Sequence, residues 1–232
     1  MKNRECILAE FKNVPANTLI MTGDLYRKKF SEQMSAAAFM KAISRLSKAG
    51  EIERVSKGIY CIPKKNRFGT ILPSDKEIVD LFTGKNNGII VGYELYNSTG
   101  VSTQVSKRIS AYSSLIDEKI KQIGNVSIQK YDLEYTDEAK SVICIMELLN
   151  NYKKIQDIDH SAFLRNIESL SKQYTEESFE VVQRVIRYPK RTVAFLNEVL
   201  NFYHVPNNLS KYLSALSDYH IPRMEDLYET AR

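Results

Sequence analysis

The first 62 residues carry a helical pattern of hydrophobic positions, followed by an extended one. Apolar side chains at Ile7, Leu8 and Phe11 predict a short helix over Glu5–Phe11 that ends before Pro15. A second short helix is expected where Thr22, with Gly23 and Asp24 behind it, supplies an N-cap.

The third predicted helix has the clearest pattern. Ser35 is a suitable N-cap, and Gly50 suits the left-handed position after the last turn. The i, i+3, i+4, i+7 spacing predicts a buried stripe of Phe39, Ala42, Ile43 and Leu46. The opposite face carries Ala37, Ala38, Lys41, Ser44, Arg45 and Lys48.

Two short alternating segments, EIERV and IYCI, flank a turn that contains Gly58 and predict a β-hairpin. Three helices followed by a two-stranded hairpin is the element order of a winged helix-turn-helix domain. The third helix, of about 14 residues and about 21 Å, is long enough to lie in a DNA major groove.

A polar, turn-rich stretch from Pro63 to Ser74 predicts a domain boundary near Arg67. We therefore expect an α+β, mostly helical protein: a winged helix-turn-helix domain over 1–67 and a C-terminal domain over 68–232. The latter is expected to be mixed α/β over 68–136 and helical over 137–232. The elements predicted there are helices at 75–82, 92–97, 138–152, 161–173, 176–187, 191–204 and 209–217, and strands at 88–91, 107–113 and 124–136.

The excess positive charge lies in the N-terminal domain. Residues 1–67 hold 14 Lys and Arg against 6 Asp and Glu, a net charge of +8, whereas residues 68–232 hold 19 against 22, a net charge of −3. This asymmetry indicates a module for an anionic partner, with nucleic acid the first candidate and an anionic membrane surface the second. An ordinary solvated surface is the alternative.

In a winged helix the third helix faces the bases and the wing faces the phosphates. Arg45 is the best candidate for a bidentate contact with guanine, because its planar guanidinium matches O6 and N7. A protein-interaction role is the alternative for such a domain. The DNA-binding residues predicted are Ser35, Lys41, Ser44, Arg45, Lys48, Arg54 and Lys57.

The sequence offers little catalytic chemistry. Three scattered cysteines and three distant histidines predict neither a disulfide framework nor a metal site, and no phosphate-binding glycine motif is present. Asp132 and Glu134 would share one face of a predicted strand and could bind Mg²⁺ in a nuclease, but alternating surface charge explains them more simply. We expect a protein that is not an enzyme and has no catalytic residues, cofactor or metal.

No apolar run approaches the ~18 residues of a membrane-spanning helix, and the N-terminus lacks a signal-peptide hydrophobic stretch. With an odd number of separated cysteines, this predicts a cytoplasmic protein that is not bound to a membrane.

Three segments resemble the AbiEi-like abortive-infection antitoxins. The first is 35–63, with its "kGiY"-type wing. The second, 92–105, is similar to the family's "GlsTQvp" segment, although Ser106 stands where proline is common. The third, 188–196, is similar to the family's "yp.r..alL" helix start. Together they are spread over most of the chain.

The resemblance implies a type IV antitoxin of a toxin–antitoxin (phage-defence) system. Its winged helix would bind inverted repeats in its own promoter and repress the operon. Its C-terminal region would help to counteract a nucleotidyltransferase toxin, without a stable complex in the best-described members. The alternative is a stand-alone winged-helix transcriptional regulator with a C-terminal domain that senses a ligand or dimerises.

Overall fold

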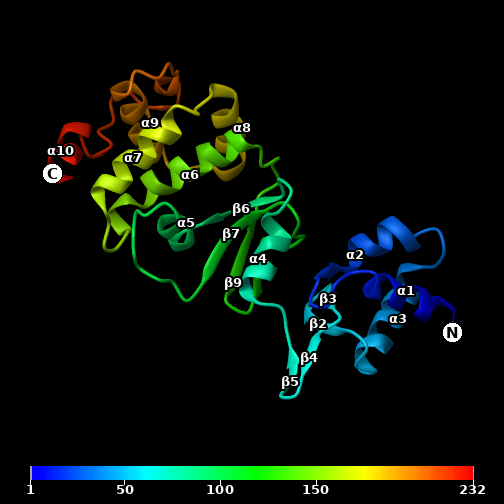
Figure 1. Cartoon of the computed structure of the whole chain (residues 1–232). Helices are drawn as coiled ribbons and strands as arrows, with labels where there is room; N and C mark the ends of the chain where they lie inside the picture. Colours follow the sequence, from blue (N-terminus) through cyan, green and yellow to red (C-terminus); the bar gives the residue numbers. More distant parts are fainter. Residues whose placement is uncertain (1, 232) are drawn as a thin grey trace. The chain divides into compact units, whose positions relative to one another are not determined.

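The computed structural model describes residues 2–231, and it separates the chain into two compact units (Figure 1). The N-terminal unit is Met1–Leu81 and the C-terminal unit is Phe82–Arg232. This division lies beyond the boundary that we expected near Arg67. The reason is that the polar stretch after Pro63 is not a bare link: strands β4 (Lys64–Asn66) and β5 (Gly69–Ile71) pair there as an antiparallel hairpin.

The N-terminal unit combines three helical segments with a small sheet. Strand order in this antiparallel sheet is β1–β3–β2, so β3 pairs both with its hairpin partner β2 and with β1, a short strand between α1 and α2. The elements are α1 (Lys2–Lys12), β1 (Ile20–Met21), α2 (Thr22–Leu25) continued by a π-helical turn (Tyr26–Phe30), α3 (Ala36–Lys48), β2 (Glu53–Ser56) and β3 (Ile59–Cys61).

The predicted third helix, hairpin and buried stripe are confirmed. Phe39, Ile43 and Leu46 are buried in one cluster with residues from α1 and β3, and Ala42 packs against it half-buried. The expected N-cap role of Thr22 is wrong. Met21 occupies the N-cap position of α2, and the buried Thr22 hydroxyl instead donates to the Gly58 carbonyl at 3.1 Å.

The C-terminal unit contains a four-stranded mixed sheet in the order β6–β7–β9–β8. The central pair, β7 and β9, is parallel and the two outer pairs are antiparallel. The predicted strand over 124–136 extends only to Lys130, because the chain beyond it has no partner strand, and β8 was not expected. The strands are β6 (Gly88–Val91), β7 (Ile109–Ser113), β8 (Ile120–Ile123) and β9 (Val126–Lys130).

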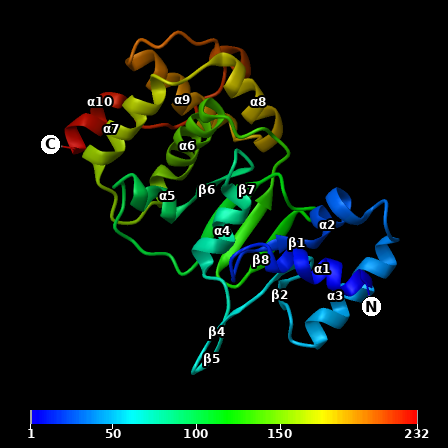
Figure 2. The ribbon, with the colours of Figure 1, turned by 45° about the vertical axis from the view of Figure 1, so that its right-hand side comes forward.

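Helix α6 is the centre of a helical bundle, since α7, α8 and α9 all pack against it (Figure 2). The helix expected over 209–217 is only a 3-10 turn at Leu209–Tyr212, and the final helix was not predicted. The remaining helices are α4 (Asp75–Thr83), α5 (Tyr93–Ser98), α6 (Asp137–Asn151), α7 (His160–Ser171), α8 (Glu176–Ile186), α9 (Lys190–Phe202) and α10 (Met224–Thr230). The protein is therefore α+β. Within residues 2–231, no helix is both long and apolar enough to cross a membrane.

Candidate nucleic-acid interface

Four polar side chains form an exposed row along α3. Lys41, Ser44, Arg45 and Lys48 follow one another at i, i+3, i+4 and i+7, so they lie on the face opposite the buried Phe39, Ile43 and Leu46. The same amphipathic pattern that fixes the helix on the core therefore presents three cations to solvent.

The N-terminus of α3 is fixed by Ser35. Its side-chain oxygen accepts a hydrogen bond from the Ala38 amide at 3.3 Å, which satisfies one of the free N–H groups of the first turn. Ser35 and the three alanines that follow it are exposed. Because the Ser35 oxygen acts as an acceptor in the cap, its hydroxyl hydrogen is left for a contact with another acceptor, and only alanines follow it in the first turn.

The turn between β2 and β3 is anchored by hydrogen bonds from Thr22, at the start of α2. Gly58 adopts a positive φ of 76°, and its carbonyl accepts both the Thr22 amide, at 2.9 Å, and the Thr22 hydroxyl. Lys57 lies in this turn and Arg54 lies on the preceding strand β2, and both are exposed. The start of α2 therefore anchors the turn that carries Lys57.

Some basic residues of the N-terminal unit are used in internal ion pairs. Arg4, Arg27 and Lys29 form ion pairs with Glu51, Asp24 and Glu10, respectively. Within the described part of the chain, by contrast, Lys41, Arg45, Lys48 and Arg54 take part in no ion pair. The cations of α3 and β2 are therefore available to an anionic partner without breaking an internal contact.

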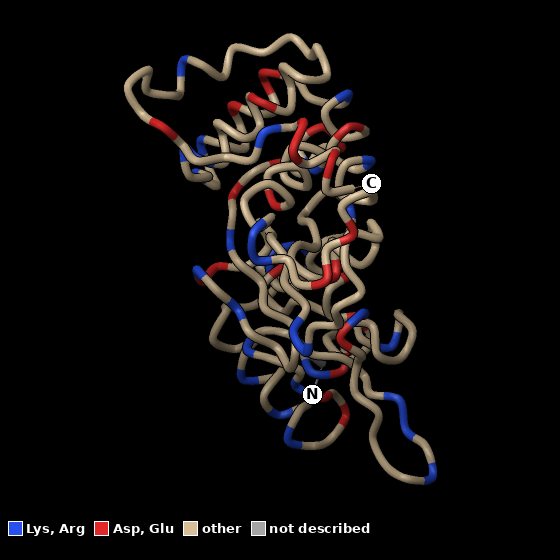
Figure 3. Tube along the Cα trace, turned by 90° about the vertical axis from the view of Figure 1, so that its left-hand side faces the viewer, with Lys and Arg blue, Asp and Glu red and all other residues tan. Residues whose placement is uncertain are grey.

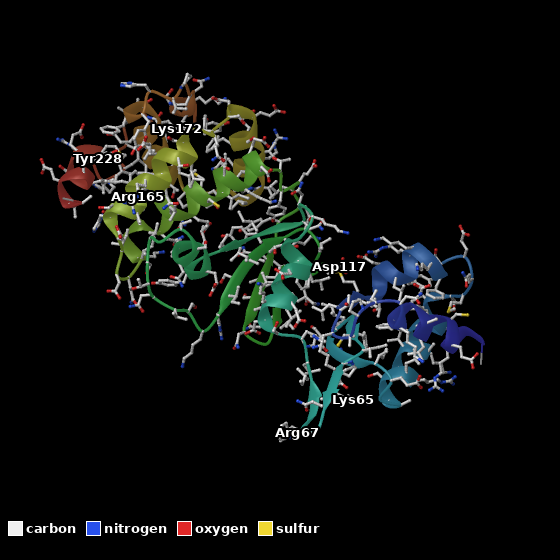
Figure 4. All side chains as sticks on the ribbon, viewed as in Figure 1. Lys65, Arg67, Asp117, Arg165, Lys172 and Tyr228 are labelled. Atoms are coloured by element: carbon white, nitrogen blue, oxygen red, sulfur yellow. The ribbon has the colours of Figure 1, made fainter. Side chains whose placement is uncertain are left out.

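The β4–β5 hairpin adds basic residues that were assigned to a link from the sequence. Every residue of both strands is exposed, and Lys65 and Arg67 extend along it, with Arg67 near its tip (Figure 4). Phe68 is 82% exposed, and the Arg67 guanidinium lies 4.7 Å from its ring centroid.

The base of this hairpin is fixed by a buried asparagine. The side-chain oxygen of Asn17 accepts a hydrogen bond from the backbone amide of Lys64 at 2.9 Å. The backbone amide of Asn17 donates to the Ile62 carbonyl at 2.8 Å. Neither strand is amphipathic, so the polar, turn-rich composition of this stretch predicted a link, whereas the structure pairs β4 with β5 and joins Lys64 to Asn17.

The charge difference between the two units remains when the observed boundary is used. Residues 1–81 hold 15 Lys and Arg against 9 Asp and Glu, a net charge of +6, whereas residues 82–232 hold 18 against 19, a net charge of −1. Basic segments recur along the N-terminal unit, and both signs are interspersed in the C-terminal unit (Figure 3). Phosphate-rich ligands would be attracted to the first unit.

Two of the three cysteines are shielded from solvent: Cys61 is buried and Cys144 is half-buried. Burial raises the pKa of both the Cys61 and the Cys144 thiol to about 11, so each is protonated at neutral pH. Among the described residues, no three His, Cys, Asp or Glu side chains come together as a metal site.

The strand on which Asp132 and Glu134 would share a face ends before them. Both are exposed, and Asp132 pairs with Lys130 at 3.5 Å. The prediction that this pair lies on a strand is therefore wrong.

Comparison with known proteins identifies a family but no activity. A search of curated proteins gave no match. The crystal structure of the RV2827C protein from Mycobacterium tuberculosis is similar to this chain, with a TM-score of 0.41 and 11% identity over 85% of this chain and 75% of that chain. Residues 12–132, more than half of the chain, match a family described only as of unknown function, DUF6088. The chain therefore belongs to the DUF6088 family.

Proposed function

We propose that this protein binds double-stranded DNA through α3 and the β2–β3 turn, and that it represses its own promoter. In this proposal residues 1–81 form a winged helix-turn-helix domain, with α3 as the recognition helix and the β2–β3 turn as the wing. The observation that carries the proposal is the exposed row of Lys41, Ser44, Arg45 and Lys48, whose cations have no ion-pair partner among residues 2–231.

Two further features support a nucleic-acid partner over a protein partner. Arg54 on β2 and Lys57 at the turn give the wing the positive charge that phosphate contacts require. The β4–β5 hairpin has cations beside an exposed phenylalanine, a combination that minor-groove proteins use to contact phosphates and to wedge between base steps. A membrane surface would also attract the cations, but α3 exposes mainly alanines and polar groups with them.

The resemblance to AbiEi-like antitoxins extends the proposal to the whole chain. On that basis the protein is the cytoplasmic antitoxin of a type IV system, and its partner is a nucleotidyltransferase toxin that it counteracts without a stable complex. The C-terminal unit, which carries no excess of positive charge, would supply the protective activity. The second candidate, a stand-alone regulator, is favoured by a pocket in that unit, described below.

The DNA-binding test uses full-length protein, the DNA upstream of its own gene and random DNA of equal length. Arg45→Ala should weaken binding to the promoter by about 1–3 kcal/mol and relax preference at one base position, because a bidentate base contact is lost. Lys57→Ala should weaken binding to both DNAs equally and reduce the salt dependence by about one phosphate contact. Fluorescence anisotropy at several salt concentrations measures both effects.

Arg165→Ala is the matched control, because Arg165 is an exposed arginine on α7 of the other unit (Figure 4). It should leave both affinities unchanged. If Arg45→Ala and Lys57→Ala reduce promoter and random binding in the same ratio, the assignment of α3 to bases and the wing to phosphates is wrong.

The antitoxin proposal needs a separate experiment. The double variant Lys41→Ala, Arg45→Ala should lose repression of a promoter reporter and still rescue growth from the neighbouring gene's product. Absence of a toxin gene, or no rescue by the wild-type protein, would favour the stand-alone regulator. Loss of rescue in the folded double variant would show that protection requires the DNA-binding face.

A further inference from the structure

A buried glutamate lies in the middle of α6. Glu147 is only 5% exposed and follows the buried residues Ile145 and Met146 along the helix. Within the described residues no lysine, arginine or histidine forms an ion pair with it. An isolated buried carboxylate is costly, so its surroundings need an explanation.

Three neutral donors hold this carboxylate. One oxygen, Oε1, accepts the hydroxyl of Tyr112 at 2.9 Å and that of Tyr188 at 2.8 Å, and the other, Oε2, accepts the Asn151 side-chain amide at 3.2 Å. Burial raises the pKa of Glu147, whereas these hydrogen bonds lower it. The network orients the carboxylate, but it provides no counter-charge.

The same carboxylate lines an aromatic pocket of about 380 Å³ within the C-terminal unit. Tyr93 and Tyr96 reach it from α5, with ring centroids 5.5 Å apart in an edge-to-face arrangement, and Tyr112 reaches it from β7. The pocket volume is in the range of small-molecule sites. Lys154, an exposed residue after α6, also lines it.

We infer that this pocket binds a small organic cation, an alkylamine or quaternary ammonium group, between the tyrosine rings and the Glu147 carboxylate. Electron-rich aromatic faces attract such cations, and a desolvated cation gains most from them. An anion would be repelled by Glu147. A divalent metal would need more charged ligands than the one carboxylate here, and no such group of ligands occurs among residues 2–231.

This inference does not rest on DNA binding. The pocket is lined by residues between 91 and 155, with Tyr188 bonded to its carboxylate, and it gives the C-terminal unit a ligand chemistry of its own. The sequence carried one signal for it, a single glutamate inside the apolar run of α6, which helical periodicity alone does not distinguish from a solvated charge.

The test measures binding of two cations, choline and n-butylammonium, to the full-length protein by calorimetry and by amide chemical shifts. Their uncharged counterparts are 3,3-dimethylbutan-1-ol and butan-1-ol. At least one cation should bind about tenfold or more tightly than its neutral counterpart, and it should shift the amides of Tyr93, Tyr96 and Asn151. Equal binding of cation and alcohol, or no saturable binding of either cation, would overturn the inference.

Two substitutions separate electrostatics from shape. Glu147→Gln should weaken binding of the cation about tenfold and leave that of the alcohol unchanged. Lys154→Ala should strengthen cation binding a few-fold by removing repulsion, whereas Lys153→Ala, at a neighbouring exposed lysine outside this pocket, should not. Because Lys154 is exposed, its variant tests the inference even if Glu147→Gln does not fold; an unchanged cation affinity there would count against it.

Discussion

The two units place their charged groups in opposite environments. In the N-terminal unit, cations on α3 are exposed, whereas in the C-terminal unit Glu147 is buried under tyrosine hydroxyls. A charge in water is stable without a partner, so an unpaired cation on the surface does not by itself indicate a ligand. Only the spatial arrangement of several such cations does. A charge out of water must be satisfied locally, so its neighbours show directly what it requires.

The largest difference between the units is expected in the stability lost when a glycine is replaced by alanine, at Gly88 in the C-terminal unit and at Gly23 in the N-terminal unit. A Cβ on Gly88 of β6 would lie 2.3 Å from the Tyr112 carbonyl oxygen and 2.5 Å from that of Phe82, whereas one on Gly23 of α2 would find its nearest neighbour, a side-chain atom of Arg27, at 3.8 Å. Gly88→Ala should destabilise the C-terminal unit by about 3 kcal/mol or more, because backbone must move. Gly23→Ala should be neutral or slightly stabilising.

Hydrogen exchange on the full-length protein measures both effects, since it reports amides of each unit separately. Gly88→Ala should speed exchange in the C-terminal unit only. Similar protection in both variants would contradict the close approach of β6 to its neighbours.

The second comparison concerns tyrosine hydroxyls that bond to a charged or to a neutral acceptor. Tyr188 donates to the Glu147 carboxylate, and Tyr26 donates to the Met34 carbonyl at 3.0 Å. Tyr188→Phe should lower the free energy of unfolding by about 1.5–3 kcal/mol, and Tyr26→Phe by about 0.5–1.5 kcal/mol. Urea denaturation gives both values. Equal losses would show that the Glu147 carboxylate gains little from this donor.

The third comparison separates two contributions of Asn17, which has a φ of +68°. Asn17→Gly removes the side-chain bond to the Lys64 amide at a cost of about 1 kcal/mol, without backbone strain. Asn17→Ala should cost about 1 kcal/mol more, because alanine disfavours this conformation. Both should speed exchange of the Lys64 amide. Continued protection of that amide in both variants would show that Asn17 does not anchor the β4–β5 hairpin.

The smallest expected effects are two pH dependences of opposite sign. Ser74 donates its amide and hydroxyl to Glu77, and these bonds lower the pKa of Glu77, so their stabilisation is lost as pH falls through that pKa. Burial raises the pKa of Glu147, so the folded state holds its proton more tightly and stability decreases as pH rises from the unfolded to the folded pKa.

Urea unfolding midpoints of the wild-type protein and of each variant, measured between pH ~3 and ~7, should show how much each glutamate contributes to the pH dependence of stability. Glu77→Gln should remove a rise of stability with pH, and Glu147→Gln should remove a fall. The same sign of change in both variants would mean that one of the two environments is misassigned.

Local signals determined what the sequence predicted well. Helix α3 and the β2–β3 hairpin were predicted because an N-cap, an amphipathic stripe and a turn glycine all lie within 27 residues, 35–61. Tyr131, Leu133 and Tyr135 do alternate with exposed Asp132 and Glu134, yet they form no strand. Their backbone bonds go to Ser113, to Tyr131 itself and to Asn86 rather than to a partner strand. Periodicity shows which side chains are buried, but pairing depends on distant segments.

The same limit explains the elements and the site residues that were missed. Strand β8 lies at an edge of its sheet, and its Ile120 is 57% exposed, so its alternation is weak. The β4–β5 hairpin depends on Asn17, which lies 47 residues before Lys64. The pocket around Glu147 joins residues from helices α5 and α6 and from strands β6, β7 and β9, and no spacing rule links them.

The distribution of the thiols provides a built-in reporter of which part of the molecule opens first. Each unit contains one shielded cysteine, Cys61 in strand β3 and Cys144 in helix α6, and Cys6 on α1 is exposed. An alkylating reagent should label Cys6 at once, and the two shielded thiols only when their surroundings unfold. The order in which mass spectrometry detects modification of Cys61 and Cys144 therefore gives the sequence of opening of the two units, without any engineered probe.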